Sequence, residues 1–375
     1  MAVSRVRAVG LVAVLGSLVL AASGCGGDAK PDPGASTLGS GLVASMNTQQ
    51  QVSSAVDDLA KDPVVAYEGA MPGSATSGDV KLTVSGGGAA LGSVDLDGDD
   101  VKVYVADGNT FIKAGKSYWD GKTTSRRAEL YAGKWVKSAS GEGVGFDPAT
   151  VLKPSAIAQA LRGTLGSVGT PVKDKVGDTD ALRVPVVGGN IFITNKAPFR
   201  ILKVDVPNLL SKGGSGSTSS GDKGLTLDHL GSKDVDGFYD DMKGTDLSGA
   251  LDSAVNFTTS GAGDLNCKTG GLCTASVRFS NSASGGKVTA QLNVTMSAAG
   301  LPTKKCSSTK SVSAGSSAKM SCKVNFSLAP SPHPKTYRVR ANYVLSARAS
   351  IDQKKINKDL DTAKKKDHDA AKKND

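Results

Sequence analysis

Cysteine and histidine are the residues of this chain best suited to form covalent bonds, bind metals or move protons. The 375 residues include five cysteines and three histidines, and none of the histidines, His229, His333 and His368, lies in a motif that pairs it with a nucleophile. A Ser-His or Cys-His mechanism needs a base held beside the nucleophile, and no G-x-S-x-G motif is present. We therefore expect no catalytic residue, no metal and no cofactor, and we interpret the protein as a non-enzyme.

Cys25 follows a segment with the layout of an export signal. Arg5 and Arg7 precede an apolar run that ends in the small residues Ala21–Gly24, and this order is typical of a secretory signal peptide. The run is short for a membrane span. Ala22-Ser23-Gly24-Cys25 resembles the lipobox of bacterial lipoproteins, in which the cysteine thiol receives a diacylglycerol and becomes the new N-terminus. The alternatives are an ordinary cleavage site and an uncleaved anchor.

From this resemblance we expect a signal peptide over residues 1–24 and a lipidated Cys25. Two or more acyl chains, palmitate for example, hold a protein on a membrane durably. The protein is then anchored through membrane lipid on the extracytoplasmic face of the cell membrane. Residues 25–41 are rich in Gly, Pro, Ser and Asp, which predicts a flexible tether.

The other four cysteines lie together in the C-terminal third of the chain. An even number of cysteines in an exported protein favours disulfides, and of the three pairings we choose the sequence-local one, Cys267 with Cys273 and Cys306 with Cys322. A zinc site is the alternative, but the segment has no C-x-x-C pair and no nearby histidine.

The formal net charge of +10 limits the classes of partner. Basic residues are dense in two places, around residues 113–127 and in the tail. Such a charge favours an anionic membrane or envelope polymer. Nucleic acid is excluded, because the chain is exported and aromatic residues, 5% of the total, are not interleaved with arginine.

Hydrophobic periodicity divides the mature chain into two folded regions. Residues 41–59 have helical spacing, short period-two runs follow, and a helix opened by proline comes after residues 146–154. This order predicts an α+β domain over 42–238. From residue 246 only alternating strands are indicated, which predicts an all-β sandwich over 246–350. Residues 351–375, rich in Lys and Asp, are interpreted as a solvated helix or disordered tail.

The region 42–238 resembles the LppX/LprAFG family of actinobacterial lipoproteins. The resemblance rests on the N-terminal helix, Val101–Ile112, Gly133–Val136, the block Phe146–Pro154 with its helix, and Leu225–Gly231. It implies a curved antiparallel half-barrel sheet closed by helices, similar to LolA and LolB. In such folds an apolar cavity between sheet and helices takes a lipid or lipoglycan.

The residues that we expect to line this cavity are Val101, Val103, Val105, Trp135, Ile157 and Leu161. For each of them ordinary core packing is the alternative. The leading hypothesis is a lipid-binding lipoprotein whose sandwich contacts an envelope polymer or a protein. The alternative is an interaction or structural lipoprotein with a solidly packed, ligand-free N-terminal domain.

Overall fold

The computed structural model describes residues 36–71, 78–138, 143–210, 224–282, 287–331 and 333–372, with side chains from residue 47 onward. The chain divides into two compact units, residues 1–43 and 44–375. The predicted signal peptide and Cys25 lie outside the described residues. None of the helices described is long and apolar enough to cross a membrane.

The described part is mixed α+β and mostly β, as the sequence predicts, and its sheets form no closed barrel. Eleven strands of the first sheet come from residues 64–229 and pair antiparallel in the order β6-β5-β4-β3-β2-β1-β11-β10-β9-β8-β7. Their bounds are β1 Val64–Ala70, β2 Asp79–Ser85, β3 Ala90–Leu96, β4 Asp99–Ala106, β5 Asn109–Lys113, β6 Val136–Ser138, β7 Val172–Val176, β8 Thr179–Val186, β9 Gly189–Thr194, β10 Ile201–Asp205 and β11 Leu225–His229.

One face of this sheet, which we call the inner face, packs on helices α1 (Ser36–Leu59), α4 (Pro148–Val151) and α5 (Pro154–Arg162). Helix α1 begins at Ser36, so residues 36–41 of the predicted tether are helical. Pro148 opens α4, and the Asp147 carboxylate caps it by accepting from the Ala149 amide. The helix that the sequence predicts after residues 146–154 is α5, and Pro154 opens it. Alternate strand residues point into this core, which gives the period-two pattern its physical cause.

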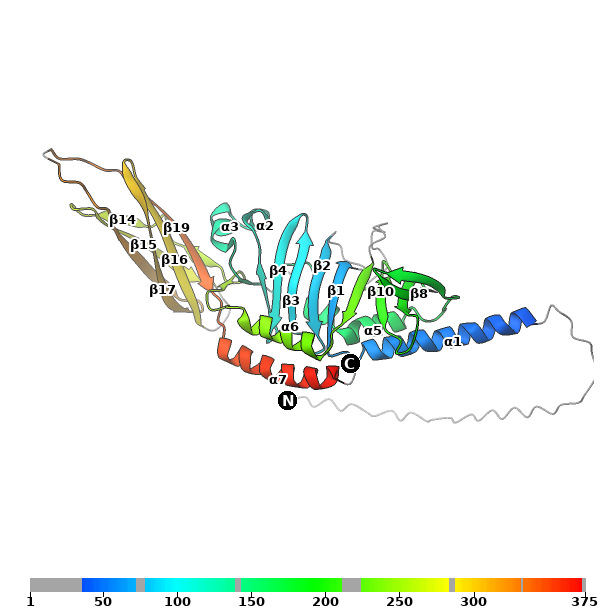
Figure 1. Ribbon diagram of the computed structural model, residues 1–375. Coiled ribbons are helices and arrows are strands. Elements are labelled where there is room, and N and C mark those ends of the chain that lie inside the picture. Colours follow the sequence, from blue (N-terminus) through cyan, green and yellow to red (C-terminus); the bar gives the residue numbers. More distant parts are fainter. Residues whose placement is uncertain are drawn as a thin grey trace, which may run out of the picture. The chain divides into compact units, whose positions relative to one another are not determined.

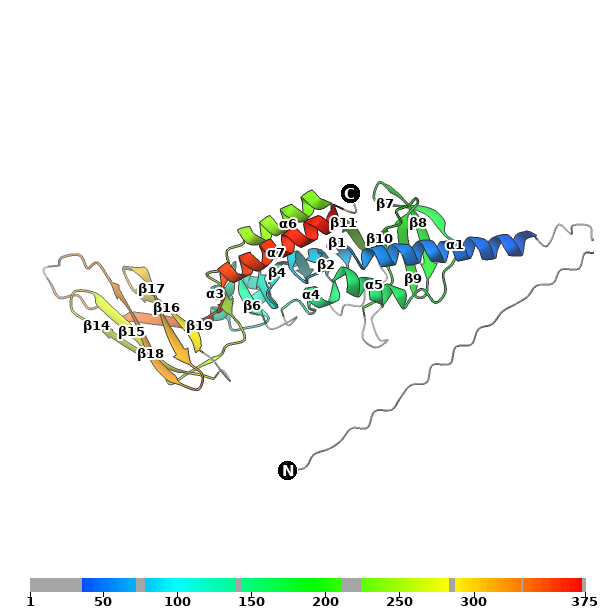
Figure 2. The same cartoon turned by 90° about the horizontal axis from the view of Figure 1, so that it is seen from below.

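The opposite, outer face carries the helices α6 (Ser232–Gly244) and α7 (Gln353–Ala371). The two helices run side by side, and α4 and α5 lie across the sheet from them (Figures 1 and 2). Of the two predictions for residues 351–375, a solvated helix or a disordered tail, the helix is correct for Gln353–Ala371, but α7 is not fully solvated. Ile356, Leu360 and Ala371 are buried there, because their spacing forms a narrow apolar stripe that suffices to cover α6.

Ion pairs and one buried hydrogen bond fix α7 on α6. Lys364 and Asp240 are 2.8 Å apart, and Lys243 and Asp361 are 2.6 Å apart. The buried Tyr239 hydroxyl donates to the Asp367 carboxylate at 2.5 Å. The last helix of the chain thereby completes the core on the outer face of a sheet formed by its first half.

The remaining strands form the C-terminal β region. They are β12 Leu251–Asp252, β13 Phe257–Thr259, β14 Asp264–Cys267, β15 Leu272–Asn281, β16 Lys287–Ala298, β17 Leu301–Ser313, β18 Ser317–Asn325 and β19 Val339–Arg348. β17, β16, β19 and β12 continue the first sheet beyond β6, whereas β13, β15, β14 and β18 make a second sheet. Both sheets contribute to one apolar core.

The two predicted disulfides are present. Cys267 and Cys273 lie opposite each other on β14 and β15. The bond between Cys306 on β17 and Cys322 on β18 joins the two sheets.

The basic segment at residues 116–130 is also ordered. It forms α2 (Lys116–Asp120) and α3 (Ser125–Tyr131), and its Arg126 and Arg127 bond to Asn342 and Asn256 of the C-terminal β region. Two of the basic side chains that the sequence assigns to an external partner therefore also bond within the molecule.

Candidate ligand-binding groove

Five of the six residues predicted to line an apolar cavity belong to the packed inner core. Val101, Val103, Ile157 and Leu161 have no exposed surface, and Val105 is 2% exposed. A side chain with no accessible surface borders no space large enough for a water molecule, so these four line no cavity in this structure. The sixth residue, Trp135, is half-buried and lies on the outer face.

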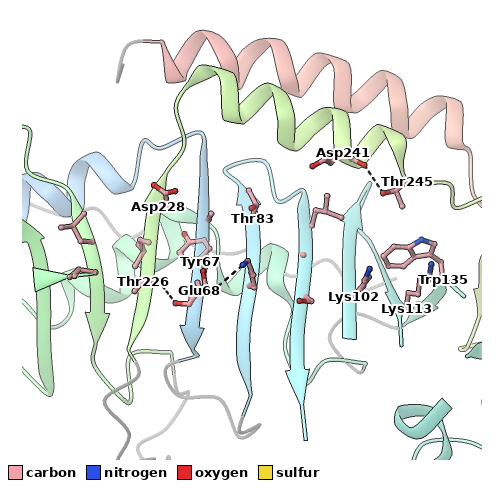
Figure 3. Close-up of a pocket in the computed structure, with 18 of the residues that line it drawn as sticks. Tyr67, Glu68, Thr83, Lys102, Lys113, Trp135, Thr226, Asp228, Asp241 and Thr245 are labelled. Carbon is pink, nitrogen blue, oxygen red and sulfur yellow. Dashed lines mark hydrogen bonds and ion pairs between the residues drawn. The ribbon is translucent and has the colours of Figure 1, made fainter. Parts of the chain in front are cut away.

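Trp135 borders a groove of about 1150 Å³ on the outer face. The strands of the sheet form its floor, and the C-terminal part of α6 forms one wall (Figure 3). Its half-buried apolar residues are Ala66, Leu91, Trp135, Val176 and Leu202. The same groove is lined by Glu68, Lys81, Lys102, Lys113, Asp228, Asp241 and Asp246.

The strand register places the groove's lysines in one line across the sheet. Glu68 pairs with Lys81, Lys81 with Ser93, Ser93 with Lys102, and Lys102 with Lys113, on five successive strands. Because side chains of directly opposed residues point to the same face, all five line one side of the sheet. We call Lys81, Lys102 and Lys113 the lysine row.

The neighbouring line of residues, one pleat closer to α6, changes from polar to apolar across the sheet. Asp228 pairs with Ala66, Ala66 with Thr83, Thr83 with Leu91, Leu91 with Tyr104, and Tyr104 with Phe111. Tyr104 and Phe111 are fully buried with α6, and burial raises the pKa of Tyr104 to about 12. The rings of Tyr104 and Trp135 make an edge contact, with the ring centres 6.1 Å apart. The apolar surface that the groove offers beneath α6 therefore comes from Leu91 and Trp135, and the lysine row lies farther from that helix.

The members of the lysine row differ in their partners. The Lys81 ammonium lies 3.9 Å from the Glu68 carboxylate, with both side chains largely exposed. For Lys102 and Lys113 the structure shows no ion pair, hydrogen bond or ring contact with any residue it describes. Their Cα atoms are nevertheless directly opposed on β4 and β5.

The wall formed by α6 and the residues directly after it carries two acidic side chains, Asp241 on the helix and Asp246 beyond its end. Asp246 accepts a hydrogen bond from the Ser248 amide at 2.8 Å, and this bond lowers the pKa of Asp246. The Thr245 hydroxyl donates to the Asp241 main-chain carbonyl oxygen at 3.1 Å. The groove thus has carboxylates on its helical wall and ammonium groups on its floor.

The histidines do not contribute to the groove. His229 is buried and bonded at both ring nitrogens, His333 is exposed, and His368 lies 3.1 Å from Asp236 on α6. No group of three or more His, Cys, Asp or Glu side chains within the described ranges is arranged to hold a metal ion.

Neither the groove nor helix α6 is predicted from the sequence. Helix α6 had a detectable signal, because Val235, Phe238, Tyr239 and Met242 follow the i, i+3, i+4, i+7 spacing of an amphipathic helix. The lysine row had none, because its members come from three strands and only the pairing register aligns them.

No protein-family model matches this chain, and a search of curated proteins finds no match. The resemblance to the LppX/LprAFG family consequently stays a prediction, and the function has to be argued from the groove.

Proposed function

We propose that this protein is a non-enzymatic lipoprotein of the cell envelope that binds an amphiphilic ligand in the groove beneath α6. In this proposal β1–β11 and their helices are a curved half-barrel, and the C-terminal β region is a sandwich that contacts an envelope polymer or a protein. Cys25 carries the lipid anchor. The observation that supports ligand binding is that the groove places half-buried apolar side chains, Leu91 and Trp135 among them, beside the lysine row.

The size of the groove suits an amphiphile. Pockets for small ligands commonly hold about 300 to 1000 Å³, and the groove encloses about 1150 Å³. An acyl chain lying along Leu91 and Trp135 removes apolar surface from water, which favours binding by about 0.8 kcal/mol for each buried methylene. A polar headgroup then meets the lysine row.

A second candidate function is a purely structural or interaction role for a ligand-free domain. The packing of the inner core favours it, since Val101, Val103, Ile157 and Leu161 have no exposed surface between sheet and helices. This alternative requires the outer groove to stay empty of ligand.

Native mass spectrometry of the secreted mature chain, with Cys25→Ser, distinguishes the two. The protein must keep residues 351–375, because α7 covers α6. After expression in a lipid-containing host we expect a co-purifying amphiphile. Ser93→Phe places a ring on the groove floor and should abolish that adduct, whereas Ser311→Phe, at an exposed position on β17, should keep it.

A protein that is reproducibly free of ligand, and that binds no added dodecyl-chain detergent below its critical micelle concentration, would contradict ligand binding and favour the structural role. An adduct that survives Ser93→Phe would show that the ligand lies elsewhere.

A further inference from the structure

Two lysines of the lysine row lie where the repulsion between their charges lowers the stability of the fold. Lys102 and Lys113 are directly opposed on neighbouring strands, a position in which Cβ atoms are about 5 Å apart and like charges repel. Antiparallel sheets commonly place opposite charges at such positions, as this one does with Glu68 and Lys81. The described residues offer Lys102 and Lys113 no carboxylate within ion-pair distance.

The surroundings of this pair strengthen its field. Lys113 is half-buried, and both side chains line the groove together with the half-buried Trp135. Figure 3 shows the two ammonium groups near the indole of Trp135, on the same side of the sheet. The groove as a whole carries both signs of charge, because Glu68, Asp228, Asp241 and Asp246 also line it. Positive potential is therefore confined to the two opposed ammonium groups, and the apolar indole beside them strengthens their attraction for an anion.

We propose that Lys102 and Lys113 form the binding site for the phosphate group of the ligand. The inference rests on the proposed binding of an amphiphile in this groove, and it assigns the chemistry of the headgroup. A phosphate monoester carries a charge of about −1.5 to −2 at pH 7, which balances two ammonium groups. Its three terminal oxygens can accept from both lysines at once.

The charges of the neighbouring groups favour an anion at Lys102 and Lys113 over other parts of the groove. Lys81 has Glu68 as a partner, and the opposite wall carries Asp241 and Asp246. An anion is repelled from that wall and drawn toward Lys102 and Lys113. The acyl chain then extends from the lysines along Leu91 and Trp135, beneath α6.

Trp135 allows binding to be measured directly. The chain has two tryptophans, and the other, Trp119, is buried and makes no hydrogen bond through its indole nitrogen. Trp119→Phe therefore loses no hydrogen bond and leaves Trp135 as the only tryptophan. A ligand that covers Trp135 shifts its emission to shorter wavelength.

The experiment titrates the Cys25→Ser, Trp119→Phe mature chain with dodecyl phosphate, dodecanoate, dodecyl maltoside and inorganic phosphate. Detergents stay below their critical micelle concentrations. We expect dodecyl phosphate to bind at least about tenfold more tightly than dodecyl maltoside. Raising the salt concentration from about 50 to about 500 mM should weaken binding of the anionic ligands and leave binding of dodecyl maltoside unchanged, because salt screens exposed charges.

The double variant Lys102→Gln/Lys113→Gln should remove the preference for phosphate while binding of dodecyl maltoside persists. Lys304→Gln/Lys305→Gln, on the edge strand β17, removes the same net charge and should keep the preference. Lys113→Gln alone should not lower the melting temperature, since it relieves repulsion. A lysine with only a structural role would lower it.

The outcomes separate this inference from the proposed function. Equal affinity for all three detergents, or an unchanged preference in the double variant, contradicts the phosphate site and leaves amphiphile binding intact. If inorganic phosphate binds and none of the three detergents does, the phosphate site is supported and the proposed binding of an amphiphile is contradicted. Tighter binding of dodecanoate than of dodecyl phosphate overturns the choice of phosphate.

Discussion

The Nδ1 atom of His229 lies 2.5 Å from Oδ2 of Asp62, and both side chains are almost completely buried. The other ring nitrogen, Nε2, lies 2.7 Å from the main-chain oxygen of Ile201. A carbonyl oxygen only accepts, so Nε2 carries a proton. Through these two contacts His229, on β11, connects Asp62, in the loop between α1 and β1, to β10.

This pair is structural, and its removal should destabilise the fold. His229→Ala leaves the Asp62 carboxylate and the Ile201 oxygen without their imidazole partner, which costs about 3 kcal/mol of unfolding free energy. Chemical denaturation measures this loss. His333→Ala, at an exposed site, serves as the control and should change nothing. Equal stability of the two variants would show that the buried pair is dispensable.

The hydrogen bond between Tyr239 and Asp367 predicts a pH dependence for the docking of α7. Burial raises the pKa of Asp367 above its usual 3.8 and, together with the Asp367 carboxylate, raises the pKa of Tyr239. The folded state thus binds the Asp367 proton more readily than the unfolded chain. The stability from this group grows as the pH falls through the raised pKa, and it is absent at higher pH.

Asp367→Asn should therefore increase the unfolding free energy at pH 7 by about 1 kcal/mol, because it removes a buried charge and its amide oxygen still accepts from Tyr239. The gain should shrink toward pH 4. Asp369→Asn, two residues along on the exposed side of α7, is the matched control. A gain that is independent of pH would contradict the assignment to Asp367.

The two disulfides should contribute unequally to stability. Cys306–Cys322 closes the longer loop, with a sequence separation of 16 against 6 for Cys267–Cys273. By chain entropy the losses on replacing each pair with alanine are about 3 and about 2 kcal/mol. Thermal unfolding of the two double variants tests this order, and non-reducing peptide mapping that linked Cys267 to Cys322 would refute the pairing.

The proposed lipid anchor predicts a change of location without a change of fold. Cys25→Ser should move the protein from the membrane fraction to the soluble fraction and leave the melting temperature of the folded part unchanged. Ser23→Ala keeps a small residue before the cysteine and should stay membrane-bound. If Cys25→Ser also stayed membrane-bound, the interpretation of residues 22–25 as a lipobox would be wrong.

The strands and the disulfides were predictable from the sequence because their signals are local. Alternation at Val101, Val103 and Val105 reports a half-buried strand directly, and β4 follows it. The spacing of the cysteines likewise suggested the pairs that form. What this alternation leaves open is whether the space beside the buried residues is filled, since core and cavity walls use the same side chains.

The groove and the buried His229 depend on contacts between distant parts of the chain. His229 and Asp62 are 167 residues apart, and no local pattern connects them. The lysines of the groove occupy positions that each strand marks only as solvent-facing. Their alignment follows from the pairing register, which loops and the packing of α6 help to set. Residues 351–375 were misread for a related reason, because a narrow apolar stripe has meaning only beside its partner helix.

The position of α7 imposes an order on how this protein can mature. Tyr104, Phe111 and the apolar side of α6 share one core with Ile356 and Leu360 of α7, which come far later in the sequence. Until α7 has been made and has docked, the preceding part of the chain exposes an unfinished apolar surface, so a nascent chain, or one clipped before α7, is the form that a chaperone or a protease recognises. A docked α7 is thus the mark of a finished molecule.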